Sequence, residues 1–194
     1  MRWHGAACEI LMTTMIKRIC VFCGSRLGAN QEYSRAAKQV GAALARRGIG
    51  LVYGGSRLGL MGDVAHAALD AGGEVVGVIP GNLLSREIAM TNLTQLHVVN
   101  NMAERKTMMG DLSDAFIVLP GGFGTLDELF EMVTLRQIGL SAKPIGLLNT
   151  AGYYNHLLAF VNHAVADGFA DDSHSHLIRV ANDAEAMVDA MCVV

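Results

Sequence analysis

Hydrophobic residues form short continuous runs that alternate with segments in which apolar positions recur every three or four residues. The runs are predicted strands, at 18–23, 50–53, 74–79, 95–99, 115–119, 144–148 and 177–180. The periodic segments are predicted helices, at 32–46, 60–70, 102–112, 126–139, 153–166 and 184–191. Strands that are apolar throughout are typical of a parallel sheet covered on both faces. The pattern therefore predicts an α/β fold, a doubly wound, Rossmann-like parallel sheet with helices on both faces.

The length and composition predict one globular domain. The chain has 194 residues, of which 52% are hydrophobic and 17% charged, and it shows no repeat, low-complexity tract or linker. Residues 1–16 are predicted to be an N-terminal extension and residues 17–194 the domain. The short apolar run near the start is too interrupted for a signal peptide and too short to span a bilayer, so we expect a cytoplasmic protein.

Charge and metal-ligating residues narrow the possible partners. The net charge of −3 gives no reason to expect a nucleic-acid or membrane surface. Cys20 and Cys23 form a C-x-x-C inside an apolar strand, so we interpret them as core thiols in a reducing compartment. His174 and His176 lie in a polar loop far along the chain from the glycine-rich turns. We therefore predict no metal and no cofactor.

Three predicted strands end in glycine-rich turns, and each turn leads towards a helix. The turns contain Gly24 and Ser25; Gly54 and Gly55; and Gly121, Gly122, Phe123, Gly124 and Thr125. Ligands bind at the carboxyl ends of parallel strands, and a helix N-terminus is suited to a phosphate. None of the turns continues as G-K-[ST], and none reads G-x-G-x-x-G with a suitable acid. A mononucleotide or sugar phosphate is therefore favoured over a nucleoside triphosphate or a dinucleotide.

Thr125 and Glu128 allow two interpretations. Thr-x-x-Glu at a helix start is a capping box, and motif statistics alone favour that interpretation. The preceding turn, however, is richer in glycine than a cap requires. In the second interpretation a phosphate occupies the amides of residues 122–125, and Glu128 faces the sugar that carries it.

Arg105 and Lys106 lie early in a predicted helix, where positive charge opposes the helix dipole. An anion held between them and the third glycine-rich turn would explain this placement. The alternative is a solvated helix face on which Glu104 pairs with the cations.

Three motifs together resemble the LONELY GUY (LOG) family of cytokinin-activating phosphoribohydrolases, many of whose bacterial members were labelled lysine decarboxylase. The motifs are YGG-x-x-x-G-L-M-G at 53–62, M-x-E-R-K at 102–106 and PGG-x-G-T-x-x-E at 120–128. The resemblance implies hydrolysis of the N-glycosidic bond of a nucleoside 5′-monophosphate to a free base and ribose 5-phosphate. The preferred substrate of the family is AMP with an isoprenoid group on its exocyclic amine.

The resemblance also implies roles for individual residues and a homodimer. Arg105 and Glu128 match the catalytic pair of the family. Glu87, Lys106, the turn at 122–125 and Thr134 match its substrate-contact positions. The sequence departs from the family pattern at Arg26, Ser56, Leu135 and Ser141–Ala142, where a serine, a glycine, a tryptophan and a histidine-containing turn are usual. These departures leave the base preference open.

Three other functions remain open. The same residues with a looser base pocket would make a purine or pyrimidine nucleotide hydrolase used in salvage. A non-catalytic carrier of a nucleotide-like cofactor could use the same phosphate turn. Lysine decarboxylation would need a lysine Schiff base to pyridoxal phosphate, from Lys106 or Lys143.

Overall fold

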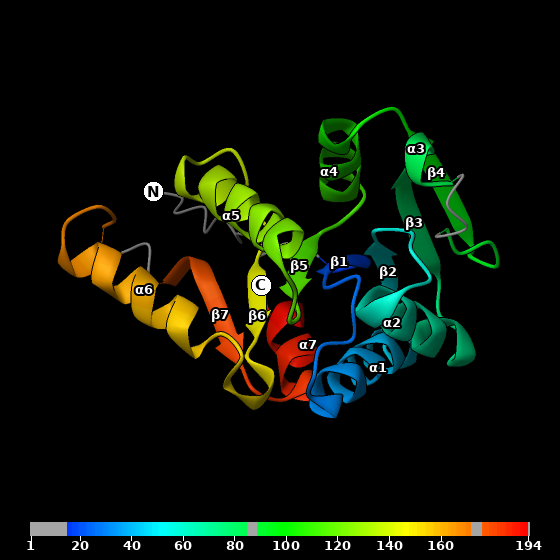
Figure 1. Ribbon diagram of the computed structural model, residues 1–194, viewed down its shortest axis with the longest axis horizontal. Helices are drawn as coiled ribbons and strands as arrows, with labels where there is room; N and C mark the ends of the chain where they lie inside the picture. The colour runs from blue at the N-terminus through cyan, green and yellow to red at the C-terminus, as the bar shows by residue number, and fades with distance from the viewer. Residues whose placement is uncertain (1–14, 85–88, 172–175, 194) are drawn as a thin grey trace, which may run out of the picture.

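The computed structural model describes residues 15–84, 89–171 and 176–193. Seven parallel strands form one sheet in the order β4-β3-β2-β1-β5-β6-β7 (Figure 1). The strands are β1 Arg18–Phe22, β2 Gly50–Tyr53, β3 Val75–Pro80, β4 Gln95–Val99, β5 Ala115–Val118, β6 Ile145–Leu148 and β7 Ile178–Ala181. The predicted doubly wound parallel sheet is confirmed.

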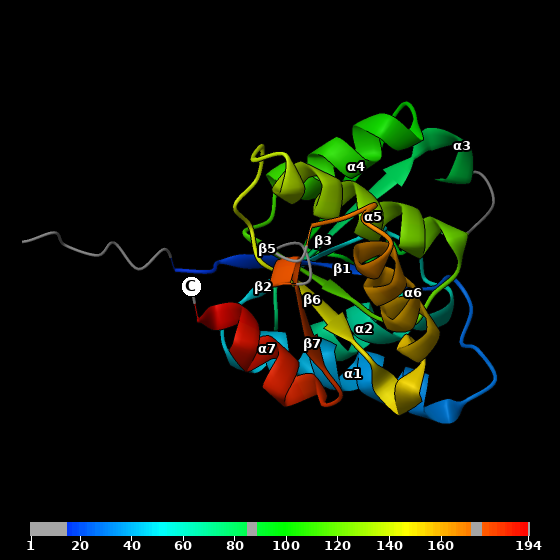
Figure 2. The ribbon, with the colours of Figure 1, turned by 90° about the vertical axis from the view of Figure 1, so that its left-hand side faces the viewer.

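Helices cover both faces of the sheet (Figure 2). One layer contains α1 Gln31–Arg46, α2 Gly59–Asp70 and α7 Ala184–Cys192. The other layer contains α3 Gly81–Leu84, α4 Met102–Asp111, α5 Phe123–Gln137 and α6 Asn155–Ala166. No helix in the described part of the chain is long and apolar enough to cross a membrane.

The core is divided by the sheet into two clusters of buried side chains. Alternate residues of β1 face opposite layers: Ile19 and Val21 pack with α1 and α2, while Cys20 and Phe22 pack with α4 and α5. Strands β2, β3, β5 and β6 are buried along their whole length, whereas the edge strands β4 and β7 are partly exposed. The continuous apolar runs therefore correspond to central strands. Cys20 and Cys23 are buried, unpaired thiols, as predicted.

The strand order places the point of topological reversal between β1 and β5. The chain runs outward from β1 to β4 and then returns to the other side of β1, where Phe22 pairs with Val118. The segments that follow β1 and β5 lead to helices on opposite faces of the sheet, which opens a crevice at the carboxyl ends of these strands. The fold thus brings the first and third glycine-rich turns together.

The structure differs from the predicted elements in three places. Helix α5 begins at Phe123, three residues before the predicted start, because the glycine-rich turn itself enters the helix at Gly122. The short helix α3 follows β3 directly, and the 3-10 turn η1 Thr150–Gly152 follows β6. Both are too short to show a helical period in the sequence. Residues 1–14 of the predicted N-terminal extension lie outside the described part.

Candidate active site

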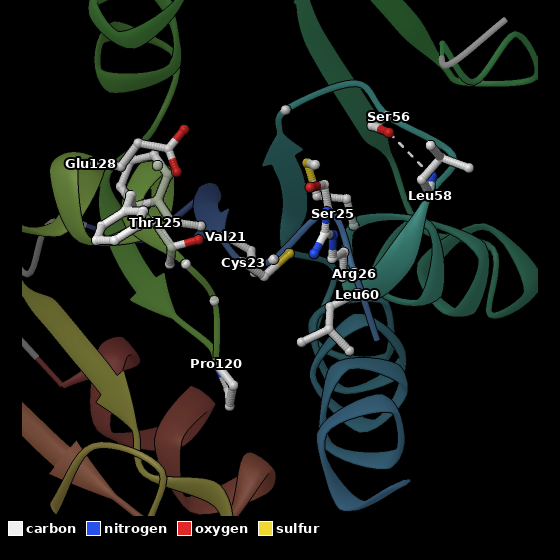
Figure 3. A pocket seen from close by; sticks show the side chains of 18 of the residues that line it. Val21, Cys23, Ser25, Arg26, Ser56, Leu58, Leu60, Pro120, Thr125 and Glu128 are labelled. Carbon is white, nitrogen blue, oxygen red and sulfur yellow. Dashed lines mark hydrogen bonds between the residues drawn. The ribbon is translucent and has the colours of Figure 1, made fainter. Parts of the chain in front are cut away.

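A cavity of about 870 Å³ lies at the carboxyl ends of β1, β2 and β5 (Figure 3). All three glycine-rich turns reach it: Gly24 and Ser25 from the first, Gly54 from the second, and residues 121–125 from the third. Gly55 is not on the cavity wall. Its positive φ of 73° and its carbonyl, which accepts from the Met90 amide, shape the turn behind Gly54. The predicted common edge is therefore the site of a cavity that all three turns line.

The N-terminus of α5 is open towards this cavity. Gly122 is the N-cap residue and makes no side-chain cap, and no acidic residue lies in the first turn. The amides of Phe123, Gly124 and Thr125 precede the first intrahelical hydrogen bond, which runs from the Leu126 amide to the Gly122 carbonyl. Free amides and the positive end of the helix dipole make this position suitable for an anion.

Thr125 adds a hydroxyl group to the same position. Its side chain lies on the cavity wall although the residue is only 4% exposed. Its hydroxyl oxygen is directed towards the cavity (Figure 3) and makes no hydrogen bond to another described residue. Thr125 Oγ1 is not one of the enclosed polar atoms that lack a partner in the described chain, so the hydroxyl is open to the cavity and can donate to a ligand there.

The capping-box interpretation of Thr125 and Glu128 is wrong. Thr125 is the third residue of α5, and the Glu128 carboxylate bonds to Arg105 instead of returning to a cap amide. A capping arrangement is found instead at the start of α4, where the Asn101 side chain accepts from the Glu104 amide at 2.9 Å. The Glu104 carboxylate accepts in turn from the Asn100 amide, also at 2.9 Å. Glu104 is thereby occupied at the cap of α4, so it is not the partner of the cations.

Arg105 and Glu128 form a buried ion pair on the cavity wall. Arg105 Nη1 lies 3.1 Å from Glu128 Oε1, and Arg105 Nε donates to the Val78 carbonyl oxygen at 3.1 Å. The residues are only 8% and 7% exposed. Gly54 provides the space for the guanidinium, because a Cβ at this position would lie 1.9 Å from Arg105 Nη2.

The environment of Glu128 changes its acidity. Burial raises the pKa of the Glu128 carboxyl to about 7, and the Arg105 guanidinium opposes this rise. Asp127 raises it further by repulsion. A carboxyl that titrates near neutrality is suited to exchanging a proton with a water molecule or a substrate.

Two residues expected at the site lie elsewhere in the single chain. Lys106 Nζ bonds to Asp127 at 2.9 Å and pairs with Glu131, and Lys106 is absent from the cavity wall. The Thr134 hydroxyl donates to the Phe130 carbonyl at 2.7 Å and lines a separate, shallow hollow on the outer face of α5. Leu135 lines that same hollow. Glu87 falls outside the described residues.

Sequence reasoning missed several residues of the wall. Tyr33 and Tyr153 close one side, and Met102 and Met109 line the part nearest α4. Nothing in the sequence marked Tyr33 as a residue of the site. The only signal for Tyr153 was its position shortly after the predicted strand at 144–148. Arg26 lies at the rim, exposed and without an ion-pair partner among the described residues.

The sequence is similar to a family profile and to curated proteins of one kind. A family profile described as "Possible lysine decarboxylase" matches residues 61–191. The chain is 50% identical over 172 residues to the probable cytokinin riboside 5′-monophosphate phosphoribohydrolase LOGL9 of Oryza sativa subsp. japonica, covering 89% of this chain and 76% of that protein. It is 48% identical over 172 residues to the cytokinin riboside 5′-monophosphate phosphoribohydrolase LOG1 of Arabidopsis thaliana, covering 89% and 81%.

Solved structures also resemble the fold. The molybdenum cofactor carrier protein of Chlamydomonas reinhardtii superposes with a TM-score of 0.69 at 23% identity, over 90% of this chain and 95% of that one. The molybdenum cofactor binding protein of Rippkaea orientalis gives a TM-score of 0.70 at 22% identity, over 90% and 94%. At these identities the likeness concerns the fold alone.

In the described part of the chain, no three His, Cys, Asp or Glu side chains cluster as metal ligands.

Proposed function

The chain belongs to the LOG family of cytokinin riboside 5′-monophosphate phosphoribohydrolases, and on this basis we propose that it hydrolyses the N-glycosidic bond of N6-substituted adenosine 5′-monophosphate. The products are the free base, a cytokinin or adenine, and ribose 5-phosphate. One observation carries the proposal beyond the names of relatives. The open N-terminus of α5 and the buried Glu128 lie on the same helix and face the same cavity.

The spacing along α5 fits a sugar phosphate. Glu128 lies three positions after Thr125, which is about 4.5 Å of helix rise. A 5′-phosphate on the amides of residues 122–125 would therefore place the attached ribose alongside the Glu128 carboxylate. Arg26, at the rim across from α5, offers a further cation to the phosphate.

The proposed chemistry assigns separate roles to Glu128 and Arg105. As the C1′–N bond breaks, its electron pair leaves with the base, which takes up a proton, and positive charge develops on the ribose. The Glu128 carboxylate stabilises this charge and accepts a proton from the water whose oxygen bonds to C1′. Arg105 holds Glu128 in place and donates its remaining N–H groups to substrate oxygens.

The cavity also fits a base with an apolar substituent. Leu27, Leu58, Leu83 and Met102 contribute apolar side chains to the wall. Because Leu135, where the family usually has tryptophan, lies outside this cavity in the single chain, its effect on base preference stays a prediction. The broader salvage hydrolase is tested by rates on AMP, on its isopentenyl derivative and on pyrimidine monophosphates.

The phosphate requirement tests the proposal directly. Free base should be released from AMP and isopentenyl-AMP with kcat/KM at least about 10²-fold higher than from the corresponding nucleosides. Two or more charge-assisted hydrogen bonds to the phosphate account for a factor of this size. Chromatography of the released base measures both rates. Equal rates on nucleotide and nucleoside would contradict the proposed phosphate site.

The pH profile tests the role of Glu128. Only the carboxylate form accepts a proton, so kcat/KM should rise between about pH 5.5 and pH 8 with a midpoint near the raised pKa of about 7. The substrate phosphate also titrates, at about pH 6. Asp127→Asn separates the two groups, because losing the repulsion from Asp127 lowers the pKa of Glu128 alone and moves the midpoint to lower pH. A midpoint unchanged by this substitution would contradict the assignment.

We also propose that two copies of the chain associate through the outer faces of α5 and α6. Helix α6 is largely apolar, yet none of its residues is buried in the single chain. Phe130, Ile138 and Leu140 on or after α5, and Phe160 on α6, are exposed. Apolar patches of this kind mark interaction surfaces. Sedimentation should give twice the 20.6 kDa chain mass, and Phe160→Glu should shift it towards one chain; a monomeric wild type would contradict the proposal.

A further inference from the structure

Three successive carbonyl groups, at residues 119–121, lead into the third glycine-rich turn, and each is held by a hydrogen bond. The Leu119 oxygen accepts from the Tyr154 hydroxyl at 2.6 Å, and the Pro120 oxygen accepts from the Gly24 amide at 3.0 Å. The Gly121 oxygen accepts from the Tyr153 hydroxyl at 2.5 Å. The orientation of this turn is therefore imposed from outside the segment.

The Tyr153 bond determines where the Gly122 amide points. The Gly121 carbonyl and the Gly122 N–H belong to one planar trans peptide, in which the two groups point in opposite directions. Because the carbonyl is directed at Tyr153, the N–H is directed to the opposite side, and it has no backbone acceptor among the described residues. Gly122 itself lines the cavity.

We infer that Tyr153 is a positioning residue for the anion site, which fixes the 121–122 peptide so that the Gly122 amide donates to the 5′-phosphate. The inference rests on the proposed function, since that function supplies the phosphate. Gly121 packs closely against its neighbours: a Cβ there would lie 2.1 Å from Thr125 Oγ1 and 2.9 Å from the Gly24 nitrogen, so the turn admits no side chain at this position.

Tyr153 is itself held firmly at its position. Its ring makes edge-to-face contacts with Tyr154 and with Tyr33, at centroid distances of 4.8 and 5.4 Å. The turn before it contains Ala151 with φ 52°, which is the only positive φ of a non-glycine residue in the described chain. The Asn149 side chain accepts from the Tyr154 amide at 2.7 Å and closes this turn. Such backbone strain persists where the surroundings impose it, as at binding sites.

Tyr154 provides a matched control. It also bonds a carbonyl of the segment, but the peptide after Leu119 belongs to Pro120, which has no N–H to present to an anion. Loss of the Tyr154 hydroxyl therefore removes a buried hydrogen bond without disorienting a phosphate donor. The two adjacent tyrosines should differ in kind: Tyr153→Phe should weaken phosphate binding, and Tyr154→Phe should lower stability.

The experiment measures binding of inorganic phosphate and of AMP by calorimetry, together with thermal unfolding, for the full-length wild type, Tyr153→Phe and Tyr154→Phe. We expect Tyr153→Phe to weaken both ligands about tenfold, the size of one lost hydrogen bond to a charged group, and to raise KM more than it lowers kcat. Tyr154→Phe should keep phosphate affinity within about twofold and lower Tm.

Unchanged phosphate affinity in Tyr153→Phe would overturn the inference, as would an equal loss in Tyr154→Phe. If Tyr154→Phe fails to fold, the Tyr153→Phe result alone decides, because the exposed Tyr153 ring is retained in that variant. A wild type that binds phosphate without releasing base would refute the proposed function and leave the positioning role intact. A wild type that binds neither phosphate nor AMP would remove both.

Discussion

Glu128→Gln is expected to lower kcat for base release from AMP by about 10²-fold or more while AMP still binds. Glutamine keeps the size of the side chain and can still accept from Arg105, but it carries no charge to stabilise the developing cation and takes no proton from water. Single-turnover kinetics and calorimetry on the same protein separate the two effects. Asp127→Asn, the neighbouring position with an exposed carboxylate, should remain active at its shifted pH optimum. Full activity in Glu128→Gln would contradict the catalytic role.

The same substitution should change stability in a pH-dependent way. The folded protein raises the pKa of Glu128 from 4.5 to about 7, so the neutral form is favoured on folding. The stability that this form contributes is fully present below pH 4.5 and is lost as the pH rises through about 7. Glu128→Gln should therefore gain up to about 3 kcal/mol of unfolding free energy at pH 8 and almost nothing near pH 4. An equal change at both pH values would contradict the desolvated carboxyl.

Gly54→Ala is the second substitution with a large expected effect. Its Cβ would lie 1.9 Å from Arg105 Nη2 and 2.8 Å from Met61 Sδ, both at the ends of flexible side chains. The backbone should therefore accept the alanine, while the guanidinium leaves its position beside Glu128. We expect a loss in kcat/KM of about 10²-fold, as for removal of one charged group from an active site, with a stability loss of only about 1–2 kcal/mol.

Gly110→Ala is the matched control for this substitution. Gly110 lies on α4, the helix that carries Arg105, and a Cβ there meets nothing within 4 Å. This variant should keep full activity and become more stable by about 0.5–1 kcal/mol, because alanine is the better helix former. Wild-type activity in Gly54→Ala would show that the guanidinium position is unimportant for the reaction.

The sequence predicted the sheet well because its central strands are covered on both faces. The runs at Val75–Pro80 and Ala115–Val118 are apolar throughout and buried throughout. The start of α5 was misplaced because glycine at 122 and 124 suppresses the helical pattern, although the backbone there is already helical from Phe123. Propensity indicates a turn at these positions, whereas the tertiary contacts of Gly121 and Gly24 impose the helix entry.

The candidate site was predicted in part. The motifs identified Arg105, Glu128 and the third glycine-rich turn, because their spacing is local. The pairing of Arg105 with Glu128 depends on how α4 packs beside β3 and α5 beside β1, and the tyrosine contacts depend on the turn after β6. Neither appears as a pattern in one segment. The homodimer, the cytoplasmic location and the contacts of Glu87, Lys106 and Thr134 with substrate stay predictions.

The central claim is that a 5′-phosphate on the free amides of α5 holds the anomeric carbon beside Glu128. The most direct measurement is a crystal structure of Glu128→Gln with AMP bound. The account predicts the phosphate on the amides of residues 122–125, with the Thr125 hydroxyl as a further donor and the ribose C1′ next to the side chain at position 128. A phosphate at another edge of the sheet, or a ribose turned away from position 128, would contradict it.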